Sequence, residues 1–313
     1  MTLPPRNIGT YDQGHAGPLV IVLGGMHGNE PAGVQALQTV FEMLALEPIH
    51  NRSFRFRGRL VGLRGNRRAL ARGQRFLDRD LNRAWRPDRV EHIRQQPKDG
   101  LVNEAAEQKE LMQCIEEEIA RYRPTQAVLF DLHTTTADGG IFSLTTDDLP
   151  SLELATSLHA PVVKGLVRGI EGTILHYFTE AVTGCPTRGV AFEAGQHDDP
   201  LSAKRAVAAI INLLRGCECV RPADVETKHD ELLQRYSFGL PTVTELIRVH
   251  RIGVEDQFVM EAGFQNFQFI RKGDVLARDR RGSIRAEADG YILMPLYQPQ
   301  GEDGFFLIKS VEL

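Results

Sequence analysis

The feature that most constrains the fold is an unbroken apolar run over residues 18–23, followed directly by Gly24 and Gly25. A run without polar alternation is typical of a parallel strand that is covered on both faces. The two glycines let the chain turn sharply after the strand. Pro31 then precedes an amphipathic run over residues 34–44 with helical spacing, and proline suits the first turn of a helix. This stretch therefore predicts a strand–turn–helix unit of an open α/β fold, in which ligands bind at the carboxyl edge of the sheet.

The turn after this first strand carries His27 and Glu30, and a second apolar run over residues 127–133 ends on His133. If the two strands are neighbours, all three side chains reach the same edge of the sheet. Two histidines and one glutamate leave a fourth tetrahedral position open for water, which is the pattern of catalytic zinc. Asp131 lies two residues before His133 on the same strand face, where it could hold an imidazole N–H. His27 with Glu30, or His133 alone, would also fit ordinary polar residues at a strand end. The two groups together indicate a metal site.

Between the two half-sites, residues 64–83 are dense in arginine and poor in apolar side chains. The segment is therefore not expected in the core, which leaves a solvated loop, a nucleic-acid patch or part of the site. A nucleic-acid patch fits poorly, because the chain has a net charge of −4, Asp78 and Asp80 interrupt the arginines, and aromatic residues are few. Arginines beside a metal can polarise a carbonyl oxygen or bind a substrate carboxylate through two parallel hydrogen bonds.

A third apolar run, residues 189–195, contains Glu193 near its end and is followed by an amphipathic helical run over residues 207–214. The helix continues the alternation of strands and helices. A glutamate at this place is either exposed at a strand end or the general base that an enzyme with a zinc-activated water needs.

Five separated motifs, in this order, resemble the succinylglutamate desuccinylase/aspartoacylase family, whose members are zinc-dependent relatives of the metallocarboxypeptidases. The resemblance covers roughly residues 16–216. The motifs are His27-x-x-Glu30, Arg75, Asp80-Leu81-Asn82-Arg83, Asp131-Leu132-His133 and Glu193-Ala194-Gly195.

The resemblance implies one zinc ion per chain, with the ligands His27, Glu30 and His133. It further implies that Glu193 is the general base and that Arg75 polarises the scissile carbonyl. Asn82 and Arg83 would bind the α-carboxylate of the substrate. Aspartoacylases proper also place an arginine and a tyrosine upstream of the catalytic glutamate, and no such pair is aligned within residues 177–188. The chemistry is therefore better supported than the identity of the amino acid.

The function that this resemblance favours is a zinc-dependent amidohydrolase that deacylates a small-molecule N-acyl amino acid, releasing a carboxylate and a free amino acid. A metallocarboxypeptidase acting on peptides is the alternative within the same chemistry. A metal-binding module without catalysis is a second alternative, against which the presence of Glu193 argues.

The expected architecture is a mixed, largely parallel sheet flanked by helices, as in zinc carboxypeptidases, over residues 1–219, and a smaller all-β domain over residues 220–313. From about residue 220 the pattern changes to short runs rich in Val, Ile, Phe and Tyr, which predict an antiparallel sandwich or barrel. Two segments, residues 272–277 and 289–295, resemble half-motifs of biotinyl/lipoyl-type folds, but the carrier lysine is absent. The resemblance implies that this domain narrows the metal cleft, and Tyr297 is a candidate substrate contact there.

Composition excludes several other classes of protein. With 42% hydrophobic and 25% charged residues, the chain of 313 residues is ordinary for a globular protein with room for a main domain and an appendage. No apolar run approaches the ~20 residues of a membrane span, and the N-terminus has no hydrophobic signal core. The four cysteines do not have the spacing of a zinc finger, so we expect reduced thiols in a cytoplasmic protein. No nucleic-acid or membrane partner is expected, and assembly into a homo-oligomer stays open.

Overall fold

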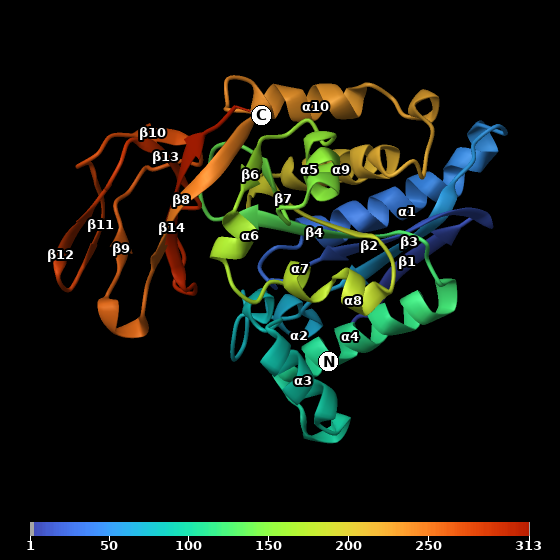
Figure 1. Cartoon of the computed structure of the whole chain (residues 1–313), viewed down its shortest axis with the longest axis horizontal. Coiled ribbons are helices and arrows are strands. Elements are labelled where there is room, and N and C mark those ends of the chain that lie inside the picture. The colour runs from blue at the N-terminus through green and yellow to red at the C-terminus, as the bar shows by residue number, and fades with distance from the viewer. Residues whose placement is uncertain (1–2, 313) are drawn as a thin grey trace.

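The fold is built on one mixed sheet, which the computed structural model describes within residues 3–312 (Figure 1). Its eleven strands run in the order β1-β3-β2-β4-β7-β5-β6-β8-β14-β13-β10. The centre is parallel, since β2 pairs in parallel with both β3 and β4, and β4 pairs in parallel with β7. β1 is antiparallel to β3 at one edge. The strands of this half are β1 (Asn7–Asp12), β2 (His15–Gly24), β3 (Arg57–Arg64), β4 (Ala127–Thr135), β5 (Phe142–Thr145), β6 (Val162–Lys164) and β7 (Thr187–Gln196).

Helices cover both faces of the central strands, so that alternate residues of each strand enter two different cores. Leu19, Ile21 and Leu23 of β2 pack with α4, whereas Val20 and Val22 pack with α1 and α9. In Figure 1, α1, α9 and α10 lie above the sheet and α3, α4 and α8 below it. The α-helices are α1 (Ala32–His50), α2 (Arg67–Leu70), α3 (Pro87–Gln95), α4 (Asn103–Tyr122), α5 (Leu149–Thr156), α6 (Leu166–Gly169), α7 (Ile174–Tyr177), α8 (Glu180–Thr183), α9 (Ser202–Gly216) and α10 (Lys228–Ser237). The short 3₁₀ turns are η1 (Leu81–Arg83), η2 (Lys98–Gly100), η3 (Pro222–Asp224) and η4 (Val254–Asp256).

The strands near the C-terminus form two sheets around a third core. One group continues the main sheet, because β8 pairs in parallel with β6, and β14 and β13 follow in antiparallel order. The other sheet has the order β12-β11-β9. Buried side chains of both sheets, among them Leu276, Ile292 and Phe305, pack together. These strands are β8 (Val243–Arg251), β9 (Val259–Met260), β10 (Gln268–Ile270), β11 (Val275–Asp279), β12 (Gly282–Arg285), β13 (Gly290–Leu293) and β14 (Asp303–Ser310).

The predicted mixed, largely parallel sheet with flanking helices is confirmed, and so is the group of extra strands near the C-terminus. The all-β expectation for the whole of residues 220–313 is wrong at its start, because helix α10 precedes the first strand there. α10 packs its buried Leu233 into the same core as α1 and α9, so this segment completes the main body. The sheet also crosses residue 220 without a break, through the pairing of β6 with β8. The division into two domains at that residue stays a prediction.

Two further expectations concern the membrane and the thiols. Within residues 3–312, no helix is both long enough and apolar enough to cross a membrane. The four cysteines are unbridged, and Cys185, Cys217 and Cys219 are buried. The expected free thiols are therefore present in the structure.

The close approach of β2 to α1 generates a test of the packing. A Cβ atom added at Gly24 would lie 2.6 Å from backbone atoms of Gly33 and Val34. We expect Gly24→Ala to lower the free energy of unfolding by about 1–3 kcal/mol, the usual cost of overpacking, as measured by urea denaturation followed by circular dichroism. Gly100→Ala is the matched control, because nothing lies within 4 Å of that position. Equal stability of the two variants would contradict close packing at Gly24.

Candidate metal centre

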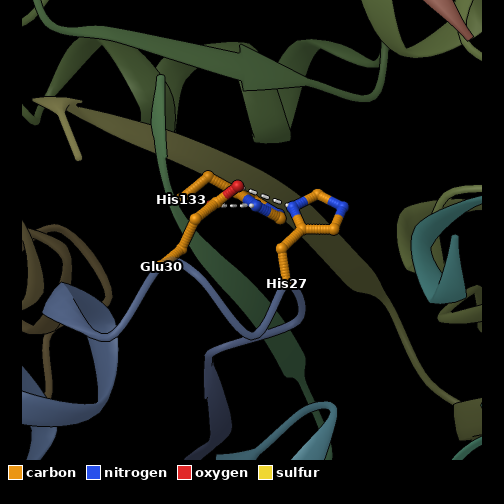
Figure 2. Close-up of side chains that lie close together, drawn as sticks. All are labelled: His27, Glu30 and His133. Atoms are coloured by element: carbon orange, nitrogen blue, oxygen red, sulfur yellow. Dashed lines mark hydrogen bonds and ion pairs between the residues drawn. The ribbon is translucent and has the colours of Figure 1, made fainter. Parts of the chain in front are cut away.

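Two imidazoles and one carboxylate converge at the carboxyl edge of the parallel strands (Figure 2). His27 and Glu30 come from the turn between β2 and α1, and His133 comes from the end of β4. One oxygen of Glu30 lies 2.8 Å from His27 Nδ1, and the other lies 3.1 Å from His133 Nδ1. One potential ligand atom of each residue lies within 4.8 Å of the others, and all three side chains are buried. The structure thus brings together the three residues that the sequence singled out as metal ligands.

The outer nitrogen of each imidazole contacts a second carboxylate. His27 Nε2 lies 3.1 Å from Asp80 Oδ1, and His133 Nε2 lies 2.7 Å from Asp131 Oδ2. A carboxylate behind a histidine holds the ring and leaves the inner nitrogen free to bind a metal. The expected position of Asp131 behind an imidazole is confirmed by this contact. Asp80 plays the same part for His27 and was not predicted.

Buried charges of opposite sign set the protonation of this cluster. Burial alone lowers the pKa of His133, but the carboxylates of Asp131 and Glu30 raise it well above its ordinary value. Burial alone raises the pKa of Glu30, and the two histidines hold it well below its usual range. The cluster thus binds positive charge strongly. That charge can be carried by protons on the imidazoles or by a cation between them.

Glu193 faces the same cavity from β7, where it pairs in register with His133 of β4. Burial raises the pKa of Glu193 to about 8, with the positive charge of His133 opposing the rise and the negative charge of Glu30 adding to it. Among residues 3–312, no donor lies within hydrogen-bond distance of Glu193 Oε2. A buried carboxyl group with an unpartnered oxygen is able to exchange a proton with a molecule in the cavity.

Arg75 lies at the edge of the cluster on the arginine-rich loop. Its guanidinium donates to Asp80 Oδ2 at 3.0 Å and approaches Glu30 Oε1 at 3.4 Å. Burial alone raises the pKa of Asp80, but the charges of His27 and Arg75 bring it well below its usual range. Asp80 therefore stays ionised and binds His27 and Arg75 at once.

Asn82 and Arg83 lie side by side in η1, but their side chains have different surroundings. The Asn82 amide donates to Asp131 at 3.2 Å, lies 3.2 Å from His133 Nε2 and accepts from the backbone N–H of Ile174 at 2.9 Å. Asn82 also lines the cavity. The Arg83 guanidinium lines the cavity and donates to Asp303 Oδ2 at 2.7 Å.

One side of the cavity is lined by residues 294–306, the segment that leads into β14 and the start of that strand. Residues of this segment that line the cavity are Met294, Leu296, Gln298, Gly301, Glu302, Asp303 and Phe306. The segment is attached to the strand-end loops, since Asn29 donates to Gln298 at 3.0 Å and Thr136 donates to the backbone oxygen of Pro295 at 3.1 Å. Residues from the C-terminal part of the chain thus line one side of the cavity, and the expectation that this part narrows the cleft stays a prediction.

Tyr297 lies in this segment but does not line the cavity. Its hydroxyl donates to the backbone oxygen of Glu261 at 2.9 Å and accepts from the backbone N–H of Phe264 at 2.8 Å. These bonds turn the ring toward the 261–264 turn and leave 40% of the residue exposed. The geometry therefore does not support the substrate contact that the sequence suggested for Tyr297.

The structure also adds residues that sequence reasoning missed. His197 lines the cavity two residues beyond Gly195, with Nδ1 2.7 Å from Thr134 Oγ1. Burial lowers the pKa of His197, which keeps the imidazole neutral near pH 7. The sequence signal that could have identified His197 is its position shortly after the Glu193 motif. Nε2 of His197 has no hydrogen-bond partner within residues 3–312.

Glu104 of α4 is a further missed residue, and it holds the loop that carries Arg75 and Asp80. Its carboxylate accepts from the backbone N–H groups of Leu77 at 2.8 Å and Asp78 at 2.9 Å, and from the side chain of Asn66 at 2.9 Å. Glu104 is buried in the first turn of its helix. No sequence signal pointed to it, because a glutamate at that position reads as a favourable helix start.

The donor set fits a zinc ion. Imidazole nitrogen and carboxylate oxygen are ordinary zinc ligands, and sites with three protein ligands leave a position open. The outer nitrogens are already held by carboxylates, and Glu193 lies beside the cluster without a partner for one oxygen. These features are those expected around a catalytic zinc rather than a structural one.

Comparison with known sequences identifies one family. The family model described as "Succinylglutamate desuccinylase/Aspartoacylase catalytic domain" matches residues 16–214. A protein of Acaryochloris marina (strain MBIC 11017) described as "Probable aspartoacylase" is 29% identical over 153 residues. The match covers 46% of this chain and 45% of that protein, so the chain spans about half the length of the curated relative it matches.

Comparison with solved structures shows the same fold over almost the whole chain. The succinylglutamate desuccinylase/aspartoacylase from Rhodobacter sphaeroides has a TM-score of 0.64 at 16% identity, covering 95% of this chain and 87% of that one. The succinylglutamate desuccinylase from Chromobacterium violaceum has a TM-score of 0.61 at 17% identity, covering 96% of this chain and 86% of that one. The arrangement of sheet, helices and C-terminal strands is therefore shared with these enzymes.

The convergence of His27, Glu30 and His133 predicts the loss of metal from two variants. His27→Ala or His133→Ala should each remove one ligand and empty the site, while the packed cores keep the fold intact. Elemental analysis should find about one zinc ion per chain in the parent protein and little in either variant. His50→Ala, at an exposed position on α1, is the control and should retain the metal. Stoichiometric zinc in both site variants would show that the ligands are different residues.

Proposed function

Because this chain belongs to the succinylglutamate desuccinylase/aspartoacylase family, we propose that it is a zinc-dependent amidohydrolase that removes the acyl group from an N-acyl amino acid. The observation that carries the proposal is the meeting of the three proposed ligand residues with Glu193, all buried side chains, at one cavity. The motifs that resembled this family in the sequence lie within the matched residues 16–214.

In this proposal each residue at the site has a defined task. Bound zinc supplies a Lewis acid that polarises the amide carbonyl and lowers the pKa of a water molecule. Glu193 takes the proton of the attacking water and returns it to the nitrogen that departs. Arg75, held by Asp80, donates an N–H to the carbonyl oxygen as negative charge develops there.

Arg83 is the main residue proposed to bind the carboxylate of the substrate. Its guanidinium lines the cavity and has a planar donor pair suited to a carboxylate. In the structure the Asp303 carboxylate occupies part of that donor set. We propose that Arg83, with Asn82 beside it in the cavity lining, binds the substrate's α-carboxylate, and that Asn82 also holds Asp131 and the loop that carries Ile174 in place.

The wall formed by residues 294–306 favours a small substrate over a peptide. A metallocarboxypeptidase needs an open groove for the chain that precedes the scissile bond. A cavity narrowed by residues 294–306 instead holds less bulk water around a small substrate, which strengthens each charge contact inside it. A binding module without catalysis would have no use for the unpartnered carboxyl group of Glu193.

The role of Glu193 can be tested by an isosteric change. Glu193→Gln keeps the shape of the side chain and removes the base, so turnover of N-acyl amino acids should fall roughly 10²–10⁴-fold, the usual worth of general acid–base catalysis. Zinc content measured on the same sample should be unchanged, because Glu193 is not a proposed ligand. Turnover close to that of the parent protein would exclude Glu193 as the base.

The choice between deacylase and carboxypeptidase is tested on the intact zinc-loaded protein. We expect release of free amino acids from short N-acetyl and N-succinyl amino acids, and no release of C-terminal residues from blocked tripeptides, because in this proposal residues 294–306 obstruct the binding of a longer chain. Both products are quantified by chromatography. Rapid cleavage of the tripeptides would overturn the deacylase proposal in favour of the peptidase.

A further inference from the structure

We propose that the amino acid released by this protein has an apolar side chain, which binds in a subsite on the inner side of the cavity. This inference rests on the proposed function and names its substrate class. The side chains that form the subsite are Leu144, Val167, Ile170, Leu175, Ala191 and Phe306. All six residues are buried and line the same cavity as the metal cluster.

The sheet register places this apolar surface directly beside the cluster. Ala191 of β7 pairs with Asp131 of β4 on one side and with Leu144 of β5 on the other. Ala191 precedes Glu193 by two residues, so the two side chains point to the same face of the sheet. A molecule at the cluster therefore has charged groups on the β4 side and apolar groups on the β5 side.

The subsite adjoins Arg83 rather than Arg75, which identifies the part of the substrate that it receives. Ile170 and Leu175 lie on either side of residues 172–174, which pack against η1: the backbone N–H of Ile174 donates to Asn82, and a Cβ atom added at Gly172 would lie 2.4 Å from the backbone oxygen of Arg83. Phe306 follows on the same strand as Asp303, the carboxylate that pairs with Arg83. If Arg83 binds the α-carboxylate and the amide carbonyl lies at the metal cluster, the remaining large substituent of the α-carbon is left to face these apolar residues. That substituent is the side chain of the amino acid.

The charges around the cavity disfavour an acidic side chain. The lining residues include five carboxylates, of Glu30, Asp131, Glu193, Glu302 and Asp303, but only two guanidinium groups, of Arg75 and Arg83. Each of these arginines already pairs with a carboxylate. Arg168 adjoins Val167, but its side chain is 75% exposed and pairs with Asp147. Among the residues that the structure describes, no guanidinium group beside the apolar subsite is left to bind a second substrate carboxylate.

The central experiment compares substrates that differ little in shape. N-acetyl-leucine, N-acetyl-asparagine and N-acetyl-aspartate have side chains of similar size that are apolar, polar and charged. We expect kcat/KM for the leucine substrate to exceed that for aspartate at least roughly tenfold, since burying an unpaired charge is costly. Equal or faster hydrolysis of the aspartate substrate would overturn the inference and leave the deacylase proposal standing.

A binding measurement decides the inference if no N-acyl amino acid is hydrolysed, an outcome that would overturn the proposed function. Isothermal titration calorimetry of the Glu193→Gln variant with the same three compounds gives their affinities without turnover. Tighter binding of N-acetyl-leucine supports the apolar subsite. Tighter binding of N-acetyl-aspartate contradicts it.

A charge placed in the subsite should reverse the preference. In Val167→Arg we expect the ratio of kcat/KM, or of affinity, for leucine over aspartate to fall at least roughly tenfold, whereas Val167→Leu should keep leucine ahead. Val254→Arg adds the same charge at a fully exposed position and should leave the ratio unchanged. An unchanged ratio in folded Val167→Arg would overturn the assignment of this subsite.

If circular dichroism shows that Val167→Arg is unfolded, Ile170→Ala replaces it. Ile170→Ala should lower kcat/KM, or affinity, for N-acetyl-leucine more than for N-acetyl-alanine. Equal losses for the two compounds would count against the subsite.

Discussion

The contacts of Glu30 with two imidazoles are the interaction on which the rest of the site depends. Its two oxygens lie 2.8 and 3.1 Å from nitrogens of His27 and His133, and the backbone N–H of Thr134 donates to it as well. Since these groups are buried, an unbalanced charge among them would be costly. Carboxylates behind both histidines add further negative charge, so positive charge at the centre stabilises the cluster. A bound cation meets that requirement without protonating the ligands.

The arginine-rich loop is held by carboxylates that come from other parts of the chain. Glu104 of α4 binds the backbone of residues 77 and 78, and Asp80 connects Arg75 to His27. Near the start of the same loop, Arg68 pairs with Glu107 of α4 at 2.5 Å. Little of the loop is in regular structure, so these bonds replace the order that a helix or strand would supply. The geometry around Arg75 thus depends on a helix that does not touch the cavity.

The continuous sheet explains how one cavity combines charged and apolar walls. The parallel strands β2, β4 and β7 bring the polar residues to one edge, where their ends meet. β5 runs antiparallel to β7 and places Leu144 beside Ala191, and β14 adds Phe306 from the C-terminal part of the same sheet. The C-terminal strands therefore contribute residues to the cavity lining. They also complete the surface that faces Arg83.

The sequence by itself predicted the central strands and the candidate metal ligands. Apolar runs without alternation predicted β2, β4 and β7, and His27, Glu30, His133 and Glu193 were assigned because each lies at or just past the end of one of these runs. Such features are local, since the burial pattern and the end of a strand can be recognised from adjacent residues.

The tertiary structure alone decided which distant residues meet. It places Asp80 behind His27, Glu104 against the backbone of the arginine-rich loop, Asp303 on Arg83 and the apolar subsite beside Glu193. It also turned Tyr297 away from the cavity, through bonds to residues 261 and 264. These contacts depend on sheet order and register, which no periodicity in the chain encodes.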